Sequence, residues 1–328
     1  MKIGILGATG AVGRQMITCL EESSLEINEL RLFASERSLG KKIPFNGEDI
    51  SLQVVGDDSF EDLDYVLGAV SNPLAMEYKD KIIEAGAIFV DNSSAFRLND
   101  DVPLIVPEIN GEEALKHKGV IANPNCSTII SLMAIASIAK LSKVESIVAT
   151  TFQAVSGAGV EGMRELNDEI EALRKGEDVE PKTFPKQIAY NAIAEIGSMT
   201  DNGYTTEEMK MQNEGRKILN LPELKVNCTC VRVPVVRSHS ISLLVNTEKE
   251  LSIEEVENEM DSFEGIKYLN DDVPSPIEVA NQDIVYVGRL RKDLINEKGI
   301  SLWCCGDQIR KGAASNAVSI IEYLVKNA

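Results

Sequence analysis

The residues with the clearest chemical potential lie at a predicted strand-to-helix junction around Cys126. The sequence reads Asn-Pro-Asn-Cys-Ser-Thr over residues 123–128 and continues into an apolar run, residues 129–141. Pro124 disfavours helix at the residue before it, and the Ser-Thr pair can satisfy the free N–H groups of a first helical turn. A helix N-terminus stabilises thiolate over thiol, and thiolate is the nucleophile. The alternative interpretation is a buried cysteine that packs as a small hydrophobe.

A thiol that takes part in proton transfer needs an acid or base nearby, and the chain has two histidines. His117 lies among surface-type residues at a predicted helix end, so we expect it to be solvated. His239 ends the segment Arg-Val-Pro-Val-Val-Arg-Ser-His, residues 232–239, just past a predicted strand. Imidazole exchanges protons near neutral pH, so His239 is the candidate partner of the thiol. A structural histidine is the alternative.

A glycine-rich turn near the start of the chain predicts a dinucleotide site. Residues 2–6 form a short apolar strand, residues 7–13 read Gly-Ala-Thr-Gly-Ala-Val-Gly, and an amphipathic helix is predicted up to about Glu22. Such glycines allow a tight turn, let the backbone approach a pyrophosphate, and let the helix pack closely on the strand. The spacing is GxxGxxG rather than GxGxxG, but its place between a strand and a helix favours dinucleotide binding.

The end of the second predicted strand, residues 30–34, bears on the choice of cofactor. Ser-Glu-Arg-Ser follows it at residues 35–38. An acidic residue there would bind the adenosine ribose of NAD, whereas Arg and Ser accept the extra phosphate of NADP. Glu36 could serve as the acid, but Arg37 between two serines favours NADP. A charged loop that binds no ligand is the alternative.

The remaining pattern predicts two domains. Short apolar runs at residues 65–70 and 87–90 flank a helical pattern, which gives the β-α-β alternation of a Rossmann-like, doubly wound parallel sheet. In the second half of the chain, strand-like runs succeed one another as in hairpins, which predicts an α+β domain with a mostly antiparallel sheet. We expect a nucleotide-binding domain over residues 1–125 and 308–328, including a C-terminal helix that returns to it, and a second domain over residues 126–307.

Composition excludes several classes of partner. The net charge of −19 argues against nucleic acid and anionic membranes, so an anionic substrate would need a local cluster of Arg and Lys. The start of the chain does not resemble a signal peptide, and the most apolar predicted helix is too short to span a bilayer, so we expect a cytoplasmic protein. The six cysteines lack framework or zinc-ligand spacing, which predicts reduced thiols and no metal.

Several motifs together resemble the bacterial aspartate-β-semialdehyde dehydrogenases. Besides the glycine turn and the segments around Cys126 and His239, they are the runs at residues 153–159, 207–210 and 306–314. They occur in the family's order along essentially the whole chain. The resemblance implies NADPH-dependent reductive dephosphorylation of L-aspartyl 4-phosphate to aspartate 4-semialdehyde and phosphate, a branch-point step towards lysine, threonine, methionine and diaminopimelate. It also implies a homodimer or homotetramer with the second domain's sheet at the interface.

The resemblance further implies a role for each matching residue. Cys126 would form an acyl-enzyme thioester, His239 would be the acid/base, and Gln153 would orient the acyl group. The substrate would be bound through its carboxylate, amino group and phosphate by Arg232, Glu207, Arg97 and Lys210, with Asn125 nearby. Contacts to NADP would come from Gly7, Thr9, Gly10, Ala11, Val12, Gly13, Arg37, Ser38, Ser71, Ser156, Gly157 and Gln308. At the last of these positions some relatives carry Asn.

Two alternatives remain open. N-acetyl-γ-glutamyl-phosphate reductases share the architecture and a Cys–His pair, but that family typically carries Pro-Gly-Cys where this chain has Pro-Asn-Cys. An acidic Glu207 also suits a free amino group, which the N-acetylated substrate lacks. A non-catalytic NADP-sensing protein could use the same fold. It would be favoured if Cys126, His239 or Arg232 were missing, and all three are present.

Overall fold

The chain passes from one structural unit to a second at Cys126 and returns to the first at Ala313. The computed structural model describes residues 1–327. The first unit comprises Met1–Asn125 and the C-terminal segment that starts at Ala313, and the second is Cys126–Gly312.

The first unit is built on a seven-stranded sheet of order β3-β4-β2-β1-β5-β6-β7. Its strands are β1 (Lys2–Leu6), β2 (Glu29–Phe33), β3 (Lys42–Phe45), β4 (Glu48–Gln53), β5 (Tyr65–Gly68), β6 (Ile88–Asp91) and β7 (Val120–Ala122). Its α-helices are α1 (Ala11–Glu22), α2 (Asn72–Glu84), α3 (Pro107–Asn110) and α9 (Ser315–Asn327). In the part of the sheet with the order β4-β2-β1-β5-β6-β7, every pair of neighbouring strands is parallel. This confirms the predicted Rossmann-like sheet.

The sequence analysis did not predict the antiparallel pair β3 and β4 at the edge of this sheet. Asn46 and Gly47 form the two-residue turn between them, and both have positive φ, 49° and 83°. An Asn-Gly turn of this kind matches the right-handed twist of the two strands, so it is a strong local hairpin signal.

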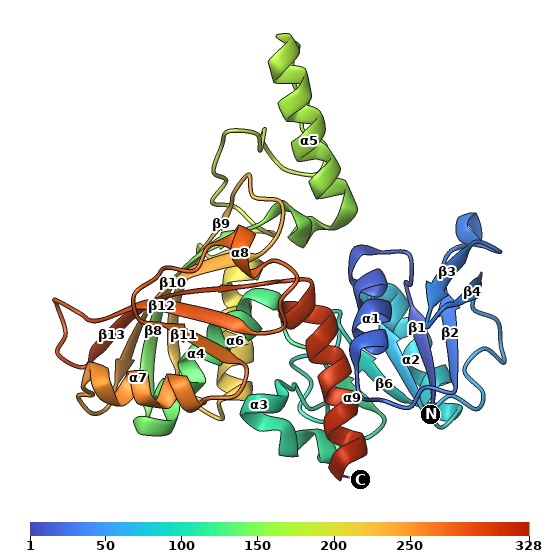
Figure 1. Cartoon of the computed structure of the whole chain (residues 1–328), viewed down its shortest axis with the longest axis horizontal. Coiled ribbons are helices and arrows are strands. Elements are labelled where there is room, and N and C mark those ends of the chain that lie inside the picture. The colour runs from blue at the N-terminus through green and yellow to red at the C-terminus, as the bar shows by residue number, and fades with distance from the viewer. Residues whose placement is uncertain (328) are drawn as a thin grey trace. The chain divides into compact units, whose positions relative to one another are not determined.

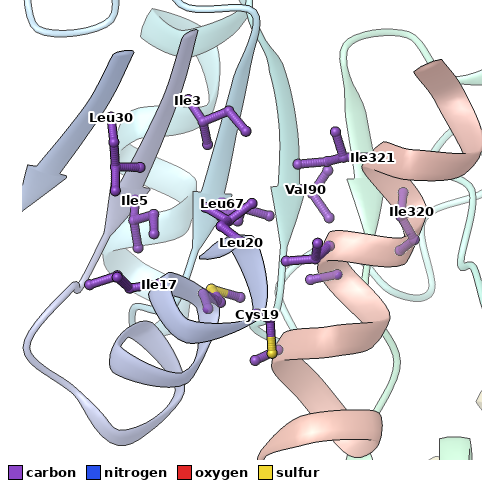
Figure 2. Close-up of a cluster of buried hydrophobic side chains, with 14 of the residues drawn as sticks. Ile3, Ile5, Ile17, Cys19, Leu20, Leu30, Leu67, Val90, Ile320 and Ile321 are labelled. Carbon is purple, nitrogen blue, oxygen red and sulfur yellow. The ribbon is translucent and has the colours of Figure 1, made fainter. Parts of the chain in front are cut away.

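The core of the first unit joins the start of the chain to its end. Figure 2 shows apolar side chains of β1, α1 and α9 packed against one another, among them Ile5, Leu20 and Ile321. All three are at most 2% exposed. Because burial of one such side chain contributes about 1.5–3 kcal/mol, α9 is held in this unit by its apolar face.

The turn between β1 and α1 requires glycine at two positions. Gly7 has a φ of +79°, and a Cβ there would lie 2.2 Å from the carbonyl oxygen of Ala69. A Cβ on Gly13 would lie 2.2 Å from the carbonyl oxygen of Gly7. The first turn of α1 therefore packs directly on the backbone of the turn, which leaves the helix N-terminus open to a ligand.

The second unit contains a six-stranded sheet of order β11-β12-β13-β10-β8-β9. Its strands are β8 (Val144–Gln153), β9 (Lys225–Arg232), β10 (His239–Thr247), β11 (Ile266–Leu269), β12 (Val285–Lys292) and β13 (Gly299–Gly306). Its α-helices are α4 (Cys126–Leu141), α5 (Gly159–Lys175), α6 (Thr206–Ile218), α7 (Ile253–Ser262) and α8 (Pro276–Val279). The three central pairings are antiparallel, as predicted, and the two edge pairings are parallel.

The helix α4 packs on one face of this sheet. The apolar helix α4 contacts β8, β10, β12 and β13, and it also contacts α6 and α7. Residues 127–138 of α4 are all buried, which is typical of a helix at the centre of a core. On the opposite face Val148 is 44% exposed, and Phe152, Leu244 and Trp303 are only partly buried.

The helix α5 extends away from the sheet of the second unit (Figure 1). It ends at Gly176, which adopts the left-handed conformation with a φ of 75° and whose N–H bonds back to the last turn. Within residues 1–327, no helix combines the length and apolar character needed to cross a membrane.

We expect the substitution Gly13→Ala to lower the free energy of unfolding by about 1–3 kcal/mol, because its new methyl group collides with backbone that cannot move aside. The measurement is the midpoint of chemical denaturation. Gly10→Ala is the matched control in the same turn, since its Cβ would meet nothing closer than 3.4 Å. Equal midpoints for the two variants would contradict the close packing of α1.

Candidate active site

Cys126 and His239 lie at the starts of two neighbouring elements of the second unit. Cys126 is the first residue of α4, as predicted, and His239 is the first residue of β10. The Sγ atom of Cys126 lies 3.4 Å from Nε2 of His239. The thiol is half-buried. The two side chains singled out from the sequence are therefore in direct contact.

The imidazole of His239 is held from its other side by the backbone. The N–H of Ala154 donates a hydrogen bond of 3.1 Å to Nδ1. His239 is fully buried. Burial, aided by the positive charge of Arg232, lowers the pKa of His239 to about 3. The ring is therefore neutral near pH 7, and its proton lies on Nε2 because Nδ1 accepts a bond.

Gln153, the last residue of β8, is buried beside this pair. Its Nε2 donates to Oγ of Ser127 at 2.8 Å, and lies 3.4 Å from Oε1 of Glu207. Glu207 in turn accepts a 2.7 Å hydrogen bond from Nζ of Lys210, one turn along α6. This network links the first turn of α4 to the first turn of α6. Sequence reasoning did not single out Ser127 as a partner of Gln153.

Arg232, the last residue of β9, is 7% exposed. Its Nη1 donates to the carbonyl oxygen of Ala154 at 2.7 Å, and its guanidinium lies over the ring of Phe184, 5.7 Å from the centroid. A Cβ on Gly157 would lie 2.7 Å from Nη1 and 3.3 Å from the His239 ring. Glycine at that position therefore leaves space in front of both side chains.

A second chain of hydrogen bonds runs beneath His239. The amide of Gln308 donates to Oγ of Ser156, which donates to the carbonyl oxygen of Val236. The N–H of Ser238 donates to Oε1 of Gln308 at 2.7 Å. Ser156 and Gln308 are both buried. Two of the residues proposed from the sequence to contact the cofactor are thus joined to the loop that precedes His239.

The remaining residues singled out from the sequence belong to the first unit. Arg97 is buried there, with Nε donating to the carbonyl of Asn123 at 2.9 Å and Nη2 to that of Asn92 at 2.8 Å. The glycine turn is followed by the N-terminus of α1, and Arg37 is exposed after β2. The others in this unit are Thr9, Gly10, Ala11, Val12, Ser38, Ser71 and Asn125.

The turn after β1 fits a dinucleotide phosphate. No side-chain bond caps the N-terminus of α1, and glycine at positions 7 and 13 keeps Cβ atoms away from its first amides. Ser71 also precedes a helix, α2, without a side-chain capping bond. These features lie at the carboxyl ends of parallel strands, where doubly wound sheets bind their ligands.

Comparisons with known proteins identify the family of the chain. Residues 2–117 match a family model described as "Semialdehyde dehydrogenase, NAD binding domain", and residues 135–311 match "Semialdehyde dehydrogenase, dimerisation domain". The chain is 43% identical to the aspartate-semialdehyde dehydrogenase of Prochlorococcus marinus, with 99% of this chain and 96% of that protein covered.

Solved structures give the same result. The aspartate semialdehyde dehydrogenase II of Vibrio cholerae, complexed with ASA, superposes with a TM-score of 0.97 at 42% identity, over 99% of this chain and 98% of that one. The enzyme of Candida albicans with NADP superposes with a TM-score of 0.76 at 25% identity, over 98% of each chain. The predicted oxidoreductase class and a nicotinamide cofactor are confirmed by these matches. Over nearly its whole length, the chain belongs to the aspartate-semialdehyde dehydrogenase family.

Proposed function

We propose that the chain catalyses the NADPH-dependent reductive dephosphorylation of L-aspartyl 4-phosphate. The products are aspartate 4-semialdehyde and phosphate, in the biosynthesis of lysine, threonine, methionine and diaminopimelate. The observation that carries the proposal is the 3.4 Å contact between Cys126 Sγ and His239 Nε2, at the N-terminus of α4. The identity of the substrate is inferred from family membership.

Cys126 is the nucleophile of this reaction. Its thiolate attacks the acyl carbon, the bond to phosphate breaks, and phosphate leaves, so that the acyl group is held as a thioester. The amides of the first turn of α4 stabilise both the thiolate and the oxygen on which negative charge develops. Bound NADPH supplies the hydride that converts the thioester to an aldehyde.

His239 acts through the proton on Nε2. Because Ala154 donates to Nδ1, the neutral ring presents an N–H to the sulfur of Cys126 and cannot take the thiol proton through that nitrogen. It stabilises the thiolate as a hydrogen-bond donor. In the reduction step the same N–H donates a hydrogen bond to the oxyanion of the tetrahedral intermediate, which collapses to the aldehyde as the bond to sulfur breaks and Cys126 leaves as thiolate.

Substrate recognition is assigned to charged groups of both units. The planar guanidinium of Arg232 binds the α-carboxylate in a forked geometry, and Glu207 binds the ammonium group. Lys210 and Arg97 bind the phosphate, with Asn125 beside the nucleophile, and Gln153 orients the acyl group. An N-acetylated substrate would leave Glu207 without its ammonium partner, which disfavours the N-acetyl-γ-glutamyl-phosphate alternative.

NADP binding is assigned chiefly to the domain formed by residues 1–125 and 308–328. The turn from Gly7 to Gly13 holds the pyrophosphate at the start of α1, and Arg37 with Ser38 binds the 2′-phosphate. Ser71 contributes from the start of α2. The second domain, residues 126–307, carries catalysis and dimerisation, and its proposed contacts to the cofactor are Ser156 and Gly157. Gln308, the first residue of the C-terminal part of the nucleotide-binding domain, is a further proposed contact.

We also propose that two copies of the chain associate through the face of the six-stranded sheet opposite α4. Val148 and Leu244 are cross-strand neighbours on that face, and Phe152 stacks near Trp303 with ring centroids 5.6 Å apart. Exposed apolar patches of this kind mark interaction sites. The matched family model is described as a dimerisation domain.

A cytoplasmic enzyme is proposed because the six cysteines are free within residues 1–327.

We expect Cys126→Ala to lower activity by at least about a thousandfold, because the acyl group then has no nucleophile to accept it. The assay follows phosphate-dependent NADP reduction with aspartate 4-semialdehyde as substrate. Cys228→Ala is the matched control, since it removes another cysteine, buried in β9. If the wild type were active with N-acetylglutamate semialdehyde and not with aspartate 4-semialdehyde, the proposed substrate would be wrong. Inactivity with both compounds would favour a non-catalytic protein.

His239 should make the protein less stable as pH falls. Its pKa is 6.5 when unfolded and about 3 when folded, so the unfolded state takes up a proton first, and stability is lost from about pH 6.5 downwards. At about 1.4 kcal/mol per pH unit, the loss is about 2 kcal/mol by pH 5. Between pH 6.5 and pH 5, the free energy of unfolding of His239→Gln should therefore decrease by about 2 kcal/mol less than that of the wild type. Parallel curves for the two proteins would contradict a neutral buried imidazole.

The proposed interface predicts that Leu244→Lys yields single chains of 35.8 kDa in sedimentation velocity, where the wild type sediments as a dimer. A charge buried between two apolar faces opposes their association. Leu39→Lys is the control, because Leu39 is 63% exposed and lies outside the sheet. An unchanged dimer in Leu244→Lys would exclude this face as the interface.

A further inference from the structure

The carboxylate of Asp307, directly after β13, holds three segments of the second unit together. It is fully buried and accepts hydrogen bonds at both oxygens. Oδ1 accepts from the N–H groups of Ile309 and Arg310 at 2.9 and 3.1 Å. Oδ2 accepts from Nε of Arg237 at 2.6 Å and from the N–H of Asn281 at 2.7 Å. Asp307 therefore ties the segment after β13 to the loop before β10 and to the turn after α8.

The two oxygens of Asp307 differ in what they do. An aspartate at a turn commonly accepts a hydrogen bond from the N–H two residues further on, and Oδ1 does so with Ile309. Oδ2 instead bonds to Arg237, which is 70 residues away along the chain. A buried carboxylate is stable only when it is paired and hydrogen-bonded. Arg237 is that charged partner, so the ion pair fixes the loop that leads into β10.

The residue between Arg237 and His239 has an unusual backbone conformation. Ser238 is buried and has a φ of +74°, in the left-handed region that costs free energy for a residue other than glycine. Such a conformation persists only where the surroundings impose it. The N–H of Ser238 donates to Oε1 of Gln308 at 2.7 Å, and His239 pairs with Gly306 across the two strands. The two residues before His239 are thus bound to two consecutive residues after β13, which sets the direction of the imidazole.

The segment after Asp307 also reaches the thiol. The N–H of Gly312 donates to the carbonyl oxygen of Asp307 at 3.0 Å. A Cβ on Gly312 would lie 2.9 Å from Cβ of Cys126, so this backbone packs directly against the nucleophile. Asp307 therefore connects the loop that carries His239 with the segment that packs on Cys126.

We propose that Asp307, through its ion pair with Arg237, is a positioning residue for the Cys126–His239 pair. The inference rests on the proposed function, in which the N–H on Nε2 of His239 stabilises first the thiolate and then the oxyanion of the tetrahedral intermediate. A hydrogen bond weakens steeply when its donor is misaligned. Displacement of a reacting group by about 1 Å can lower the rate about a hundredfold.

The first measurement needs no substrate. It follows the rate at which iodoacetamide alkylates Cys126 at a series of pH values, by mass spectrometry of the labelled peptide. Asp307→Asn keeps an oxygen for two of the donors but presents an NH₂ group to the other two. We expect the midpoint of its rate–pH curve to lie about 0.5–1 pH unit above that of the wild type, because His239 no longer donates to the thiolate. Asp293→Asn is the matched control, since Asp293 accepts from the N–H of Asn296 in the hairpin between β12 and β13.

A double-mutant cycle shows whether Asp307 acts through His239. In a His239→Ala background, Asp307→Asn should shift the curve no further, because no imidazole remains to be positioned. In phosphate-dependent oxidation of aspartate 4-semialdehyde, Asp307→Asn should lower kcat about ten- to a hundredfold and leave the KM of the semialdehyde within about threefold.

Arg237 provides an independent variant from the other side of the ion pair. Arg237→Met should shift the alkylation curve and lower kcat in the same direction, and it decides the question alone if Asp307→Asn fails to fold. Arg237→Lys, which still offers the carboxylate a charged donor, should recover part of the loss.

The proposal is overturned if the folded variants at Asp307 and Arg237 keep the wild-type alkylation curve and kcat. It is also overturned if Asp307→Asn shifts the curve as much in the His239→Ala background as in the wild type. If the wild type does not oxidise aspartate 4-semialdehyde but the alkylation results are as expected, the proposed function is wrong and the positioning role stands.

Discussion

The candidate active site depends on one hydrogen bond, from the backbone N–H of Ala154 to Nδ1 of His239. It fixes the orientation of the ring and also determines which nitrogen carries the proton. Since the donor belongs to the backbone directly after β8, the arrangement is set by the sheet rather than by a mobile side chain. The pairing of β8 with β10 brings Ala154 and His239 together, so the central strands of the second unit define the chemistry of Cys126.

Local signals in the sequence predicted many elements of the fold. The helix start at Cys126, the glycine turn before α1 and the parallel sheet of the first unit follow from short patterns of proline, glycine and apolar residues. The β3–β4 hairpin carries an equally local signal in Asn46 and Gly47, and was overlooked. The parallel pairing of β8 with β9 was not predictable, because these strands are distant along the chain. The strands β11 and β12 are consecutive, but a crossover that contains α8 makes them parallel, where the succession of strand-like runs had indicated hairpins.

The sequence also indicated which residues could do chemistry, but not how they touch. Contact between Cys126 and His239 joins positions more than a hundred residues apart, and no periodicity encodes it. The hydrogen bond from the backbone N–H of Ala154 to His239 could not be predicted, because every residue except proline offers the same N–H. Gln153 was expected to serve the acyl group, while its bond to Ser127 depends on how the end of β8 packs on α4.

The position of Cys126 at the first residue of α4 has a further consequence. Residues 127–138 of this helix are buried, and the helix contacts four strands and two other helices. Its first turn therefore cannot fray without exposing the hydrophobic core. Regions of this kind open only when the whole cooperative unit opens. The reactive sulfur thus shares the kinetic stability of the core, and thermal inactivation should follow the unfolding of the second unit.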